Sequence, residues 1–517
     1  MDYYRTIGIT LMSSLMLVGC NIKPKPIDDA SRLTSLLEDQ AEIYGHQEAI
    51  NGPLTFYDAL ARALKYNFEN RLSMMEAVLQ DSQLDVATLN MLPKLTISAG
   101  YQGRQSELAS SSESVLTRRQ SLEASTSQDQ NRGVADLNFT WNVLDFGVSY
   151  YQAQQQADRI LIAQERRRKV INNLVKEVLA AYWSASIADH LLPKLEPVLQ
   201  DAEQALQLSK TIENDRLQPI LGVLEYQRSL LRVIGQLKKL RADLLVAKPK
   251  LASLINAPIH SELVLAQQEV IPEPPRLKAS PADLENIGLF YRPELREEIY
   301  QERISRVEAW KEILKVMPGL TIPLSANWDS NSFLVHQLWL EAGARTTFNL
   351  VNLIAAPKIW SSAQTQIEVA KTRRRALSVA ALVQINIGYQ QYLKALDSYD
   401  SATQLSSVDQ GIYQFISNSS ETDTGTALER IHAATAALAS QLEREQSLAE
   451  IYGALGNIYA SIGLDPAVGK VEHITVRALA VQLEKTMSRW YAGHLPKPPR
   501  FAKPTADLKP KAVKEKV

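Results

Sequence analysis

The hydrophobic residues of the chain follow two different periods, and the change from one to the other predicts its elements. Within residues 134–144, apolar side chains occupy every second position. These apolar positions are Leu137, Phe139, Trp141 and Val143. A period of two predicts a strand with one apolar and one polar face. After Gly147 the period lengthens to that of a helix, through a Gln- and Ala-rich run that closes on an arginine triplet at 166–168.

The same succession recurs in the second half of the chain. Residues 338–350 alternate in the same way, and a second Gln- and Ala-rich run closes on an arginine triplet at 373–375. In both halves, the last aromatic residue of the strand stands 25 positions before the first arginine of the triplet. Equal spacing between equivalent features indicates that the chain is an internal duplication.

A helix and a further strand precede the alternating stretch of the first half. Thr55 and Asp58 have the spacing of a capping box, and a helical stripe of apolar residues then continues to Pro93. Residues 95–102 alternate with a period of two. The Ser-rich segment 105–133 between the two strands is too hydrophilic to pack, and we expect a mobile loop there.

The second half repeats this order. Ser280 and Pro281 are expected to begin its opening helix, with the serine as cap and the proline at the first helical position. Pro318 corresponds to Pro93 and precedes a strand that alternates over residues 320–328. Pro323 cannot donate a hydrogen bond inside that strand, so we expect a bulge at this residue.

A long helical hairpin is expected after the second strand of the first half. Its arms cover residues 150–210, with bends at Pro193 and Pro197, and residues 219–255. At about 1.5 Å per residue, arms of some 40 to 60 residues reach roughly 60 to 90 Å. Such helices are far longer than those of a compact domain.

The second half ends in a comparable hairpin. No proline occurs between Pro357 and Pro466, and only the polar stretch 418–425 interrupts the helical pattern. Thr426 and Glu429 have the spacing of a capping box, so we expect the second arm to begin there. Each half is therefore predicted to contain a helix, two strands and a long helical hairpin.

The strands restrict how the chain can assemble. Strands of about ten residues with one apolar face have the length of tilted membrane-spanning β-strands. Four strands cannot close a barrel, and an open sheet in lipid would leave edge N–H and C=O groups unpaired at a cost of several kcal/mol each. The chain is therefore expected to pool strands with other copies, and three copies would supply the twelve strands of an acceptable barrel. The alternative is a soluble sheet packed on helices, which also alternates.

Composition excludes several other classes of protein. The net charge is −1, so no basic excess suggests nucleic-acid binding. The single cysteine, Cys20, excludes a disulfide framework within the chain and a multi-thiolate metal site. The histidines are scattered, and the metalloprotease, nucleophile-elbow and phosphate-loop motifs are absent from the sequence. We therefore expect neither an enzyme nor a bound cofactor or metal.

The N-terminus carries Arg5, an apolar run over residues 7–18, and a Leu-Val-Gly-Cys sequence that ends at Cys20. The run is too short for a transmembrane helix and has the length of a signal-peptide core. Its end resembles the lipobox of bacterial lipoproteins, which implies cleavage before Cys20 and acylation of that residue. Asn21 in place of an aspartate implies, by the same resemblance, sorting to the outer membrane. An ordinary signal peptide with an incidental cysteine is the alternative.

The order of helix, strand, strand and long helical hairpin, repeated twice behind such a leader, resembles the TolC-type outer-membrane efflux protein family over nearly all of residues 54–470. The matching details are Leu54-Thr55 with Ala59, Ala63 and Asn67, the sequence Arg292-Pro293-Glu294-Leu295, and the proline-then-strand joins at Pro93 and Pro318. The resemblance implies a mainly α-helical fold with membrane β-strands. In that fold, a homotrimer joins a twelve-stranded barrel in the outer membrane to a periplasmic α-helical barrel that forms a tunnel.

The resemblance also divides the chain and names its partners. The parts are a lipoprotein signal peptide (1–19), a lipidated tether with a short helical patch (20–53), a first repeat (54–270), a linker (271–283), a second repeat (284–470), and an equatorial segment with a disordered Pro/Lys-rich tail (471–517). The implied partners are a periplasmic adaptor (membrane fusion) protein and an inner-membrane pump or secretion ATPase. The function predicted is therefore the outer-membrane channel-tunnel of a tripartite efflux or type I secretion system, lipid-anchored and extending into the periplasm. The alternative is a periplasmic coiled-coil lipoprotein that acts as a scaffold or adaptor.

Two groups of polar residues are candidates for the channel itself. The first group lies at the reversals of the two hairpins, farthest from the strands, and would form a periplasmic aperture: Glu213, Asp215, Glu421 and Asp423. Carboxylates in a confined opening favour cations, although acidic residues at a turn also simply solvate it and stabilise a helix N-terminus. The second group lies on the polar side of the strands and would line the barrel lumen: Asp136, Asn138, Glu341 and Arg345. We expect these residues to solvate the lumen rather than to bind substrate selectively, and we expect the arginine triplets to be a solvated helix face rather than a substrate or lipid contact.

The lipobox generates the first prediction. Replacing Cys20 with alanine should abolish labelling of the protein by radioactive palmitate and block its maturation, because the thiol is the acylated atom. Two or more acyl chains give stable anchoring, whereas one is marginal. Persistent labelling of the alanine variant would contradict the prediction.

Overall fold

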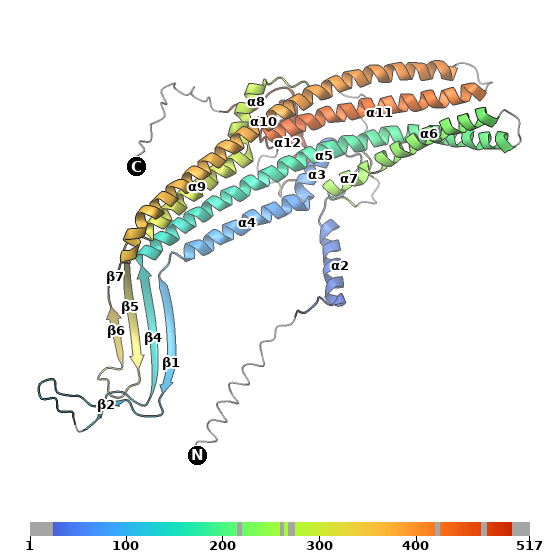
Figure 1. Ribbon diagram of the computed structural model, residues 1–517. Coiled ribbons are helices and arrows are strands. Elements are labelled where there is room, and N and C mark those ends of the chain that lie inside the picture. Colours follow the sequence, from blue (N-terminus) through green and yellow to red (C-terminus); the bar gives the residue numbers. More distant parts are fainter. Residues whose placement is uncertain are drawn as a thin grey trace, which may run out of the picture.

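The computed structural model describes residues 24–121, 123–214, 220–258, 263–266, 274–418, 424–466 and 473–498. The chain forms an elongated body in which a sheet stands at one end and long helices run from it to the opposite end (Figure 1). None of the described helices combines the length and the apolar character needed to cross a membrane.

The predicted duplication organises the elements. The first repeat contains α3 (Phe56–Tyr66), α4 (Phe68–Leu89), β1 (Lys94–Gly103), β4 (Asn131–Asn142), α5 (Val143–Asn214), α6 (Ile220–Leu245) and α7 (Ala247–Leu254). The second contains α8 (Pro281–Tyr291), α9 (Pro293–Leu314), β5 (Gly319–Asp329), β6 (Leu338–Ala342), β7 (Arg345–Thr347), α10 (Leu350–Asn418) and α11 (Thr424–Ser461). Helix α2 (Asp29–Gly45) precedes the repeats and α12 (Val476–Tyr491) follows them, while β2 (Ala109–Ser110) and β3 (Ser125–Thr126) pair within the loop between β1 and β4.

Equivalent positions of the two repeats form the same local structure. Thr55 and Ser280 each accept a hydrogen bond from the backbone N–H of an aspartate three residues later, whose carboxylate accepts one in return, so both predicted caps are confirmed. The opening helix of each repeat breaks once, at Asn67 (φ −66°, ψ 126°) and at Arg292 (φ −62°, ψ 125°). In both cases the equivalent residues are 225 positions apart.

The join between the second strand and the long helix is also repeated. The side-chain oxygen of Asn142 accepts a hydrogen bond from the N–H of Leu144 at 3.0 Å, and that of Asn349 accepts one from Val351 at 3.1 Å. Each asparagine thus satisfies one of the unpaired N–H groups at a helix start. The two long helices consequently begin directly after the strands, α5 at Val143 rather than near residue 150 as expected.

The strands form one antiparallel sheet in the order β1, β4, β5, β6, with β7 also paired to β5. Thr96, Asn138, Ser325 and Glu341 lie opposite one another in a row that crosses all four strands. Because paired residues share a face, this register places the predicted polar positions of the four strands on one side of the sheet.

The bulge expected at Pro323 is absent. Pro323 pairs with Thr140 of β4 in an uninterrupted register. The interruption lies instead on the other side, where the partner strand is divided into β6 and β7 between Ala342 and Arg345. There the N–H of Gly343 donates to the Pro323 carbonyl at 3.0 Å, but the proline has no N–H to return. The missing donor therefore divides the edge strand without adding a residue to β5.

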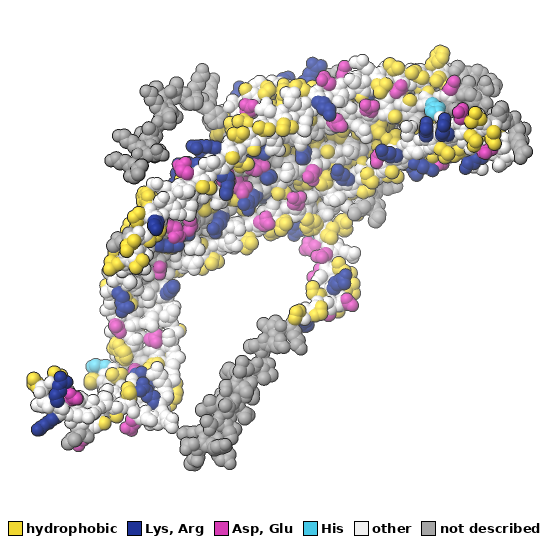
Figure 2. Space-filling model, in the orientation of Figure 1, with side chains coloured by type: hydrophobic (Ala, Val, Ile, Leu, Met, Phe, Trp, Pro, Cys, Tyr) yellow, Lys and Arg dark blue, Asp and Glu magenta, His cyan; other side chains and the backbone are white. Residues whose placement is uncertain are grey.

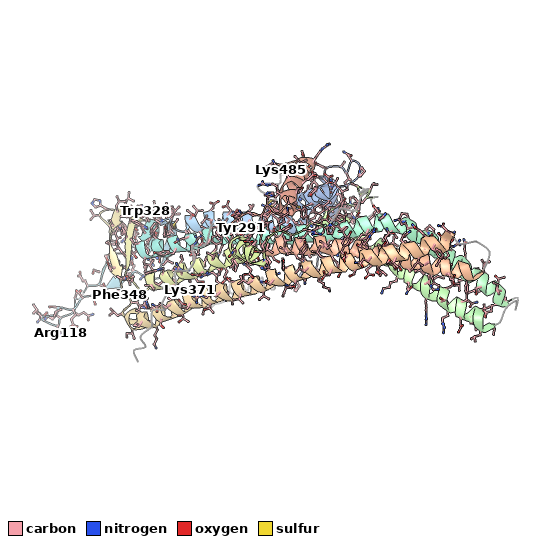
Figure 3. The ribbon with its side chains drawn as sticks, turned by 90° about the horizontal axis from the view of Figure 1, so that it is seen from above. Arg118, Tyr291, Trp328, Phe348, Lys371 and Lys485 are labelled. Atoms are coloured by element: carbon pink, nitrogen blue, oxygen red, sulfur yellow. The ribbon has the colours of Figure 1, made fainter. Side chains whose placement is uncertain are left out.

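The long helices form a curved wall rather than a bundle around one core. Next to the sheet, successive contacts run in the order α4, α5, α9 and α10. Toward the opposite end, α6 takes the place of α4 and α11 that of α9, so the order becomes α6, α5, α11 and α10 (Figures 1 and 3). The wall therefore has one edge made by α4 and α6 and another made by α10.

Several helix boundaries differ from the expectations. The return arm of the first hairpin is divided at Val246, because Pro249 cannot donate to the carbonyl of Leu245, where α6 ends. By contrast, α5 stays continuous through Pro193 and Pro197. Helix α11 begins at Thr424, so the expected capping box two residues later is not its start. The mixed region expected after residue 471 contains the regular helix α12.

An apolar core lies midway along the wall, where the short helices pack on the long ones. Helix α3 packs between α5 and α12, and its residues Ala59, Leu60 and Ala63 are fully buried. Other members of this core come from nearly every element that meets here; fully or almost fully buried are Leu191, Leu251, Ile255, Leu284, Ile451, Leu455, Ile458 and Leu483. This equatorial core holds the sheet-side and tip-side halves of the wall together.

Gly463 gives a test of this junction. It follows α11 with φ +73°, and a Cβ built on it would lie 2.5 Å from Cα of Arg292. We expect Gly463→Ala to destabilise the protein by about 1–3 kcal/mol or more, because both the backbone angle and the contact oppose a side chain. The midpoint of chemical denaturation, followed by helical circular dichroism, measures the effect.

Gly453 supplies the matched control. It lies inside α11, and a Cβ there would meet no atom within 4 Å. Gly453→Ala should leave stability unchanged or raise it by about 0.5–1 kcal/mol through helix propensity. Equal effects of the two substitutions would show that the close approach at Gly463 does not matter.

Candidate functional site

The polar face of the sheet collects three of the four predicted lumen residues in adjacent rows. Asn138 and Glu341 belong to the same row, and Asp136 lies in the next one, paired with Asn327. The side-chain amide of Asn138 donates to Asp136 at 2.5 Å. Arg345 lies on the same face beyond the division of the edge strand, paired with Thr321. The geometry thus gives one mainly polar surface, with Trp339 in the row of Asp136, while its role in a lumen stays a prediction.

The opposite face of the sheet is apolar and uncovered. Its exposed members are Leu95, Ile97, Tyr101, Leu137, Trp141, Leu320, Leu324, Trp328, Leu338 and Leu340. Ile97 and Leu340 are 81% and 84% exposed, so they have essentially no packing partner. No described helix covers either face (Figure 1). A soluble sheet packed on helices would bury one face, and this sheet does not.

Both edges of the chain present unpaired groups. At one edge lies β1, and α4 extends this edge along the wall. The apolar side chains that α4 exposes are Leu72, Met75, Val78, Leu79, Val86 and Leu89. At the other edge, β6 and β7 continue into α10, which exposes Val369, Val379, Val383, Ile387, Leu405, Val408, Ile412 and Phe415. The outer strands have a strand partner on one side only. Each edge therefore combines a row of free backbone groups with an apolar helical stripe.

The wall between these edges is held together by ion pairs as well as apolar contacts. Buried Asp158 of α5 forms an ion pair with Arg303 of α9. About two turns further along α5, buried Glu165 forms an ion pair with Arg296 of α9 at 3.0 Å and accepts a hydrogen bond from Arg168 at 2.7 Å. Such pairs fix the relative position of α5 and α9, although each contributes little net stability.

The arginine triplets belong to this network. Arg166 pairs with Glu297 of α9 at 2.8 Å, and Arg374 of α10 pairs with Glu302 of α9 at 2.9 Å. Arg168 additionally donates to the carbonyl of Gly463 at 3.1 Å. The expectation of a merely solvated helix face is therefore wrong for Arg168, which ties α5 to the end of α11, and for Arg374, which ties α10 to α9, whereas Arg166 is exposed and pairs at the surface.

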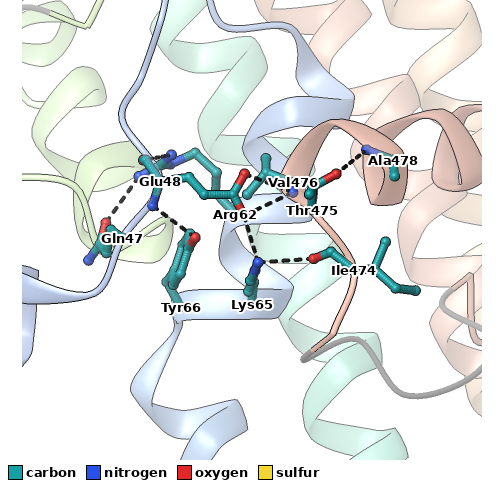
Figure 4. Close-up of polar contacts among 9 residues, drawn as sticks. All are labelled: Gln47, Glu48, Arg62, Lys65, Tyr66, Ile474, Thr475, Val476 and Ala478. Carbon is teal, nitrogen blue, oxygen red and sulfur yellow. Dashed lines mark hydrogen bonds and ion pairs between the residues drawn. The ribbon is translucent and has the colours of Figure 1, made fainter.

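A polar clamp ties the N-terminal segment to the equatorial core (Figure 4). The carboxylate of Glu48 accepts hydrogen bonds from Lys65 Nζ at 2.6 Å and from the backbone N–H of Val476, the first residue of α12, at 3.1 Å. Lys65 also donates to the carbonyl of Ile474 at 2.9 Å. Buried Arg62 donates to the carbonyl of Glu48 at 2.6 Å. The clamp fixes the point from which α2 projects, and α2 itself has no buried residue.

Glu213 is the aperture candidate that lies within the described residues at the hairpin tips. Glu213 accepts a hydrogen bond from Gln227 of α6 at 2.8 Å, which links the arms of the first hairpin. The other aperture candidates, Asp215, Glu421 and Asp423, lie outside the described residues, as does Cys20. Figure 2 shows basic side chains gathered beside a histidine near the free ends of the helices. Among the described residues there, Arg228, Arg232 and Arg430 are exposed and have no ion-pair partner.

The described residues hold no cluster of His, Cys, Asp and Glu suited to a metal ion. The sequence pattern predicted the faces of the strands, because a period of two reports directly on a sheet. It missed the ion pairs between α5, α9 and α10, the Glu48 clamp and the regular helix α12. The sequence of α9 carries glutamates at 294, 297, 298 and 302. This run of acidic residues was the available signal for the ion pairs between α5, α9 and α10.

Known proteins with the same architecture can now be compared. Residues 69–257 match the family described as outer membrane efflux protein. The solved structure of the outer-membrane channel OprN matches 79% of this chain and 89% of its own, at 15% identity and a TM-score of 0.57. The open-state MtrE channel of Neisseria gonorrhoeae matches 78% of this chain and 88% of its own, at 15% identity and a TM-score of 0.54. The CmeC channel of Campylobacter jejuni gives 90% and 98% coverage, 12% identity and a TM-score of 0.58.

A search of curated proteins finds no match to the chain. At the identities of the solved structures, their likeness concerns the fold. Together with the family match over the first repeat, it confirms the resemblance drawn from the sequence and the predicted order of the elements.

The Glu48 clamp predicts a pH dependence of stability. Hydrogen bonding from Lys65, with a further bond from Val476, lowers the pKa of Glu48 below its ordinary 4.5. A carboxylate with a lowered pKa in the folded state stabilises the protein above its unfolded pKa, and that contribution is lost as the pH falls through the folded pKa. Glu48→Gln should therefore be less stable than the parent at pH 7, and the difference should shrink below about pH 4.

Thermal unfolding of the two proteins across this pH range measures the difference. Glu38→Gln is the matched control, because Glu38 is an exposed glutamate of α2. Its effect should not vary with pH. A pH-independent effect of Glu48→Gln would mean that the carboxylate charge does not hold the clamp.

Proposed function

We propose that this chain, which resembles the outer membrane efflux protein family in its first repeat and in its fold, is one protomer of a homotrimeric outer-membrane channel. The channel would carry substrates from the periplasm or an inner-membrane transporter to the cell exterior. It would be the outer component of a tripartite efflux or type I secretion system. It needs no enzymatic step of its own.

The observation that carries this proposal is the uncovered sheet. Its apolar face exposes large side chains from all four strands, and both outer strands lack a partner on one side. In water such edges pair with other chains, and in lipid they must be paired. A sheet closed with further copies pairs the backbone groups of both edges. If its apolar face points outward to lipid, its polar face points inward to water, so closure meets the requirements of both faces and both edges.

In the proposed ring, each edge of one chain pairs with the opposite edge of the next. The strand edge at β6 and β7 continues into α10, and that at β1 continues into α4, so strands and helices can close around the same axis. Contact between unlike edges is a heterologous interface, which forms a ring when the rotation closes. Three copies give twelve strands, within the size range of outer-membrane barrels.

In such a ring the polar face of the sheet lines the lumen. Asp136, Asn138, Glu341 and Arg345 then face the channel, and their mixed charges keep it wet without selecting one sign of cargo. The long helices continue the lumen as a periplasmic tunnel. Ion pairs such as Glu165 with Arg296 support this role, because they hold adjacent helices of a thin wall in register.

The hairpin tips would form the periplasmic mouth and meet the adaptor. Six tips meet there in a trimer, with Glu213, Asp215, Glu421 and Asp423 as the candidate carboxylates of the opening. The described side chains behind the tips are basic at Arg228, Arg232 and Arg430. An acidic opening would therefore lie beside exposed arginines that alternate with Glu225 and Glu429, and a partner protein can recognise such a charge pattern.

The lipid on Cys20 would anchor the same molecule independently of its strands. Residues 24–28 and α2 lead from that end of the chain to the clamp at Glu48. Acyl chains in the membrane and a fixed point in the equatorial core would orient each chain before the barrel closes. This is the proposed purpose of the tether.

The two faces of the sheet give the test of function. Leu340→Arg places a charge on the apolar face and should cost about 2–4 kcal/mol if the residue faces lipid near the midplane. We expect loss of trimer assembly in the outer membrane and loss of single-channel conductance in planar bilayers. Semi-denaturing electrophoresis of outer-membrane fractions measures the assembly.

Asn138→Arg is the control. Asn138 lies in the row of paired residues next to that of Leu340, but on the opposite face of the sheet. This variant should assemble and conduct. Equal tolerance of arginine on both faces would assign the alternation to a water-soluble sheet. Assembly without conductance in the parent protein would favour the scaffold.

A further inference from the structure

A small polar cavity lies inside the helical wall, beside the break between α8 and α9. Its volume is about 60 Å³. The residues that matter for its chemistry are Lys169, Asn172 and Lys176 of α5, Arg292 at the break, Glu294 of α9 and Gln384 of α10. The last turn of α11 closes it. The cavity is separate from the lumen-facing strands and from the hairpin tips.

Two buried side chains that line this cavity lack hydrogen-bond partners. Asn172 is 4% exposed, and neither Nδ2 nor Oδ1 of its amide is bonded to any described residue. Arg292 is 8% exposed; its Nε donates to Glu294 at 3.1 Å and its Nη2 to Gln384 at 2.5 Å, but Nη1 has no partner. Buried polar groups are nearly always hydrogen-bonded. A species in the cavity that offers both acceptors and a donor, water included, would satisfy these atoms.

The charges on the lining decide the sign of that species. Lys169, Lys176 and Arg292 are cationic, and Glu294 is the only carboxylate among the lining residues. Burial opposes ionisation of Glu294, yet Arg292 lowers its pKa overall, so it stays charged. Glu294 already pairs with Arg292 and, at 3.5 Å, with Lys169. Lys176 has no ion-pair partner in the described part of the chain. The lining carries a positive excess that an anion would balance.

Size and donor pattern narrow the anion to a small oxyanion. One water molecule needs about 10–15 Å³ of such space, so the cavity exceeds a single water but has no room for a nucleotide or a lipid headgroup. A guanidinium and an ammonium together suit phosphate oxygens. Oδ1 of Asn172 requires a donor, which hydrogen phosphate supplies through its O–H and sulfate lacks.

We propose that this cavity binds one inorganic phosphate ion per chain, held by Arg292, Lys176 and Asn172. The ion joins α5 to the break between α8 and α9, at the level where α11 ends. It is a structural ligand of the wall and not a transported substrate. The proposal is independent of the channel function and would hold equally for a scaffold.

Calorimetric titration of the full-length protein, purified in detergent and dialysed free of phosphate, tests this assignment. Phosphate should bind with a stoichiometry of one per chain and more tightly than sulfate. Lys176→Gln should weaken phosphate binding about tenfold or more, because it removes one charge-assisted hydrogen bond. Asn172→Asp, which has the same shape but adds a negative charge, should abolish it.

Lys239→Gln is the control, because Lys239 is an exposed lysine of α6 far along the chain from the cavity. It should leave phosphate affinity unchanged, and circular dichroism should show all three variants folded. The proposal is overturned if the parent protein binds no phosphate, in which case the cavity holds water only. It is equally overturned if sulfate binds as tightly, or if Lys176→Gln and Asn172→Asp bind phosphate like the parent.

Discussion

The backbone hydrogen bonds of the sheet impose the constraint on which the rest of this structure depends. Four strands with an apolar face on one side and free edges on both sides cannot be stable alone in water or in lipid. In the proposed trimer this constraint is met by repetition, since each half contributes one hairpin of strands and each copy would contribute one sheet. The apolar stripes of α4 and α10 follow the same edges, so the contact that completes the sheet in that trimer would also complete the helical wall.

A wall one helix thick has little interior, which explains its chemistry. Outside the equatorial core, most side chains of α5, α9 and α10 reach water on one face or the other, and neighbours meet only along narrow strips. Ion pairs such as Asp158 with Arg303 occupy these strips. They add little net stability, but they disfavour sliding of one helix along its neighbour, because a shifted register would leave buried charge unpaired. In the proposed tunnel, register would matter more than strength, because the wall would have to keep one diameter along its length.

Much of the architecture could be predicted from the sequence, and the exceptions have physical causes. Period and caps identify the strand faces and the starts of the opening helices, because both depend on residues adjacent in the chain. The sequence shows that Pro323 lacks an N–H. It does not show which neighbouring strand would have accepted that N–H, so the position of the interruption could not be predicted. The pairing of Arg374 with Glu302 and of Glu48 with the start of α12 joins residues far apart in sequence, which local periodicity does not report. The faces of the candidate lumen residues could be predicted because they depend on adjacent residues. The cavity beside Arg292 could not be predicted, because its lining residues lie far apart in the sequence.

The two breaks in the opening helices show how duplicated halves acquire different chemistry at one geometry. At Asn67 the side chain accepts from the N–H groups of Glu69 and Asn70 and so caps the next helix itself. At Arg292 the next residue is Pro293, which has no N–H to be satisfied, and the side chain at the break makes no cap. The same backbone angles are thus reached by a capping side chain in one repeat and by a proline in the other. The N–H groups equivalent to those that Asn67 caps belong to Glu294 and Leu295, so the proline does not remove them. It presets the backbone angle of the first helical residue instead, and the side chain at the break is a guanidinium in the second repeat where the first repeat has a capping amide.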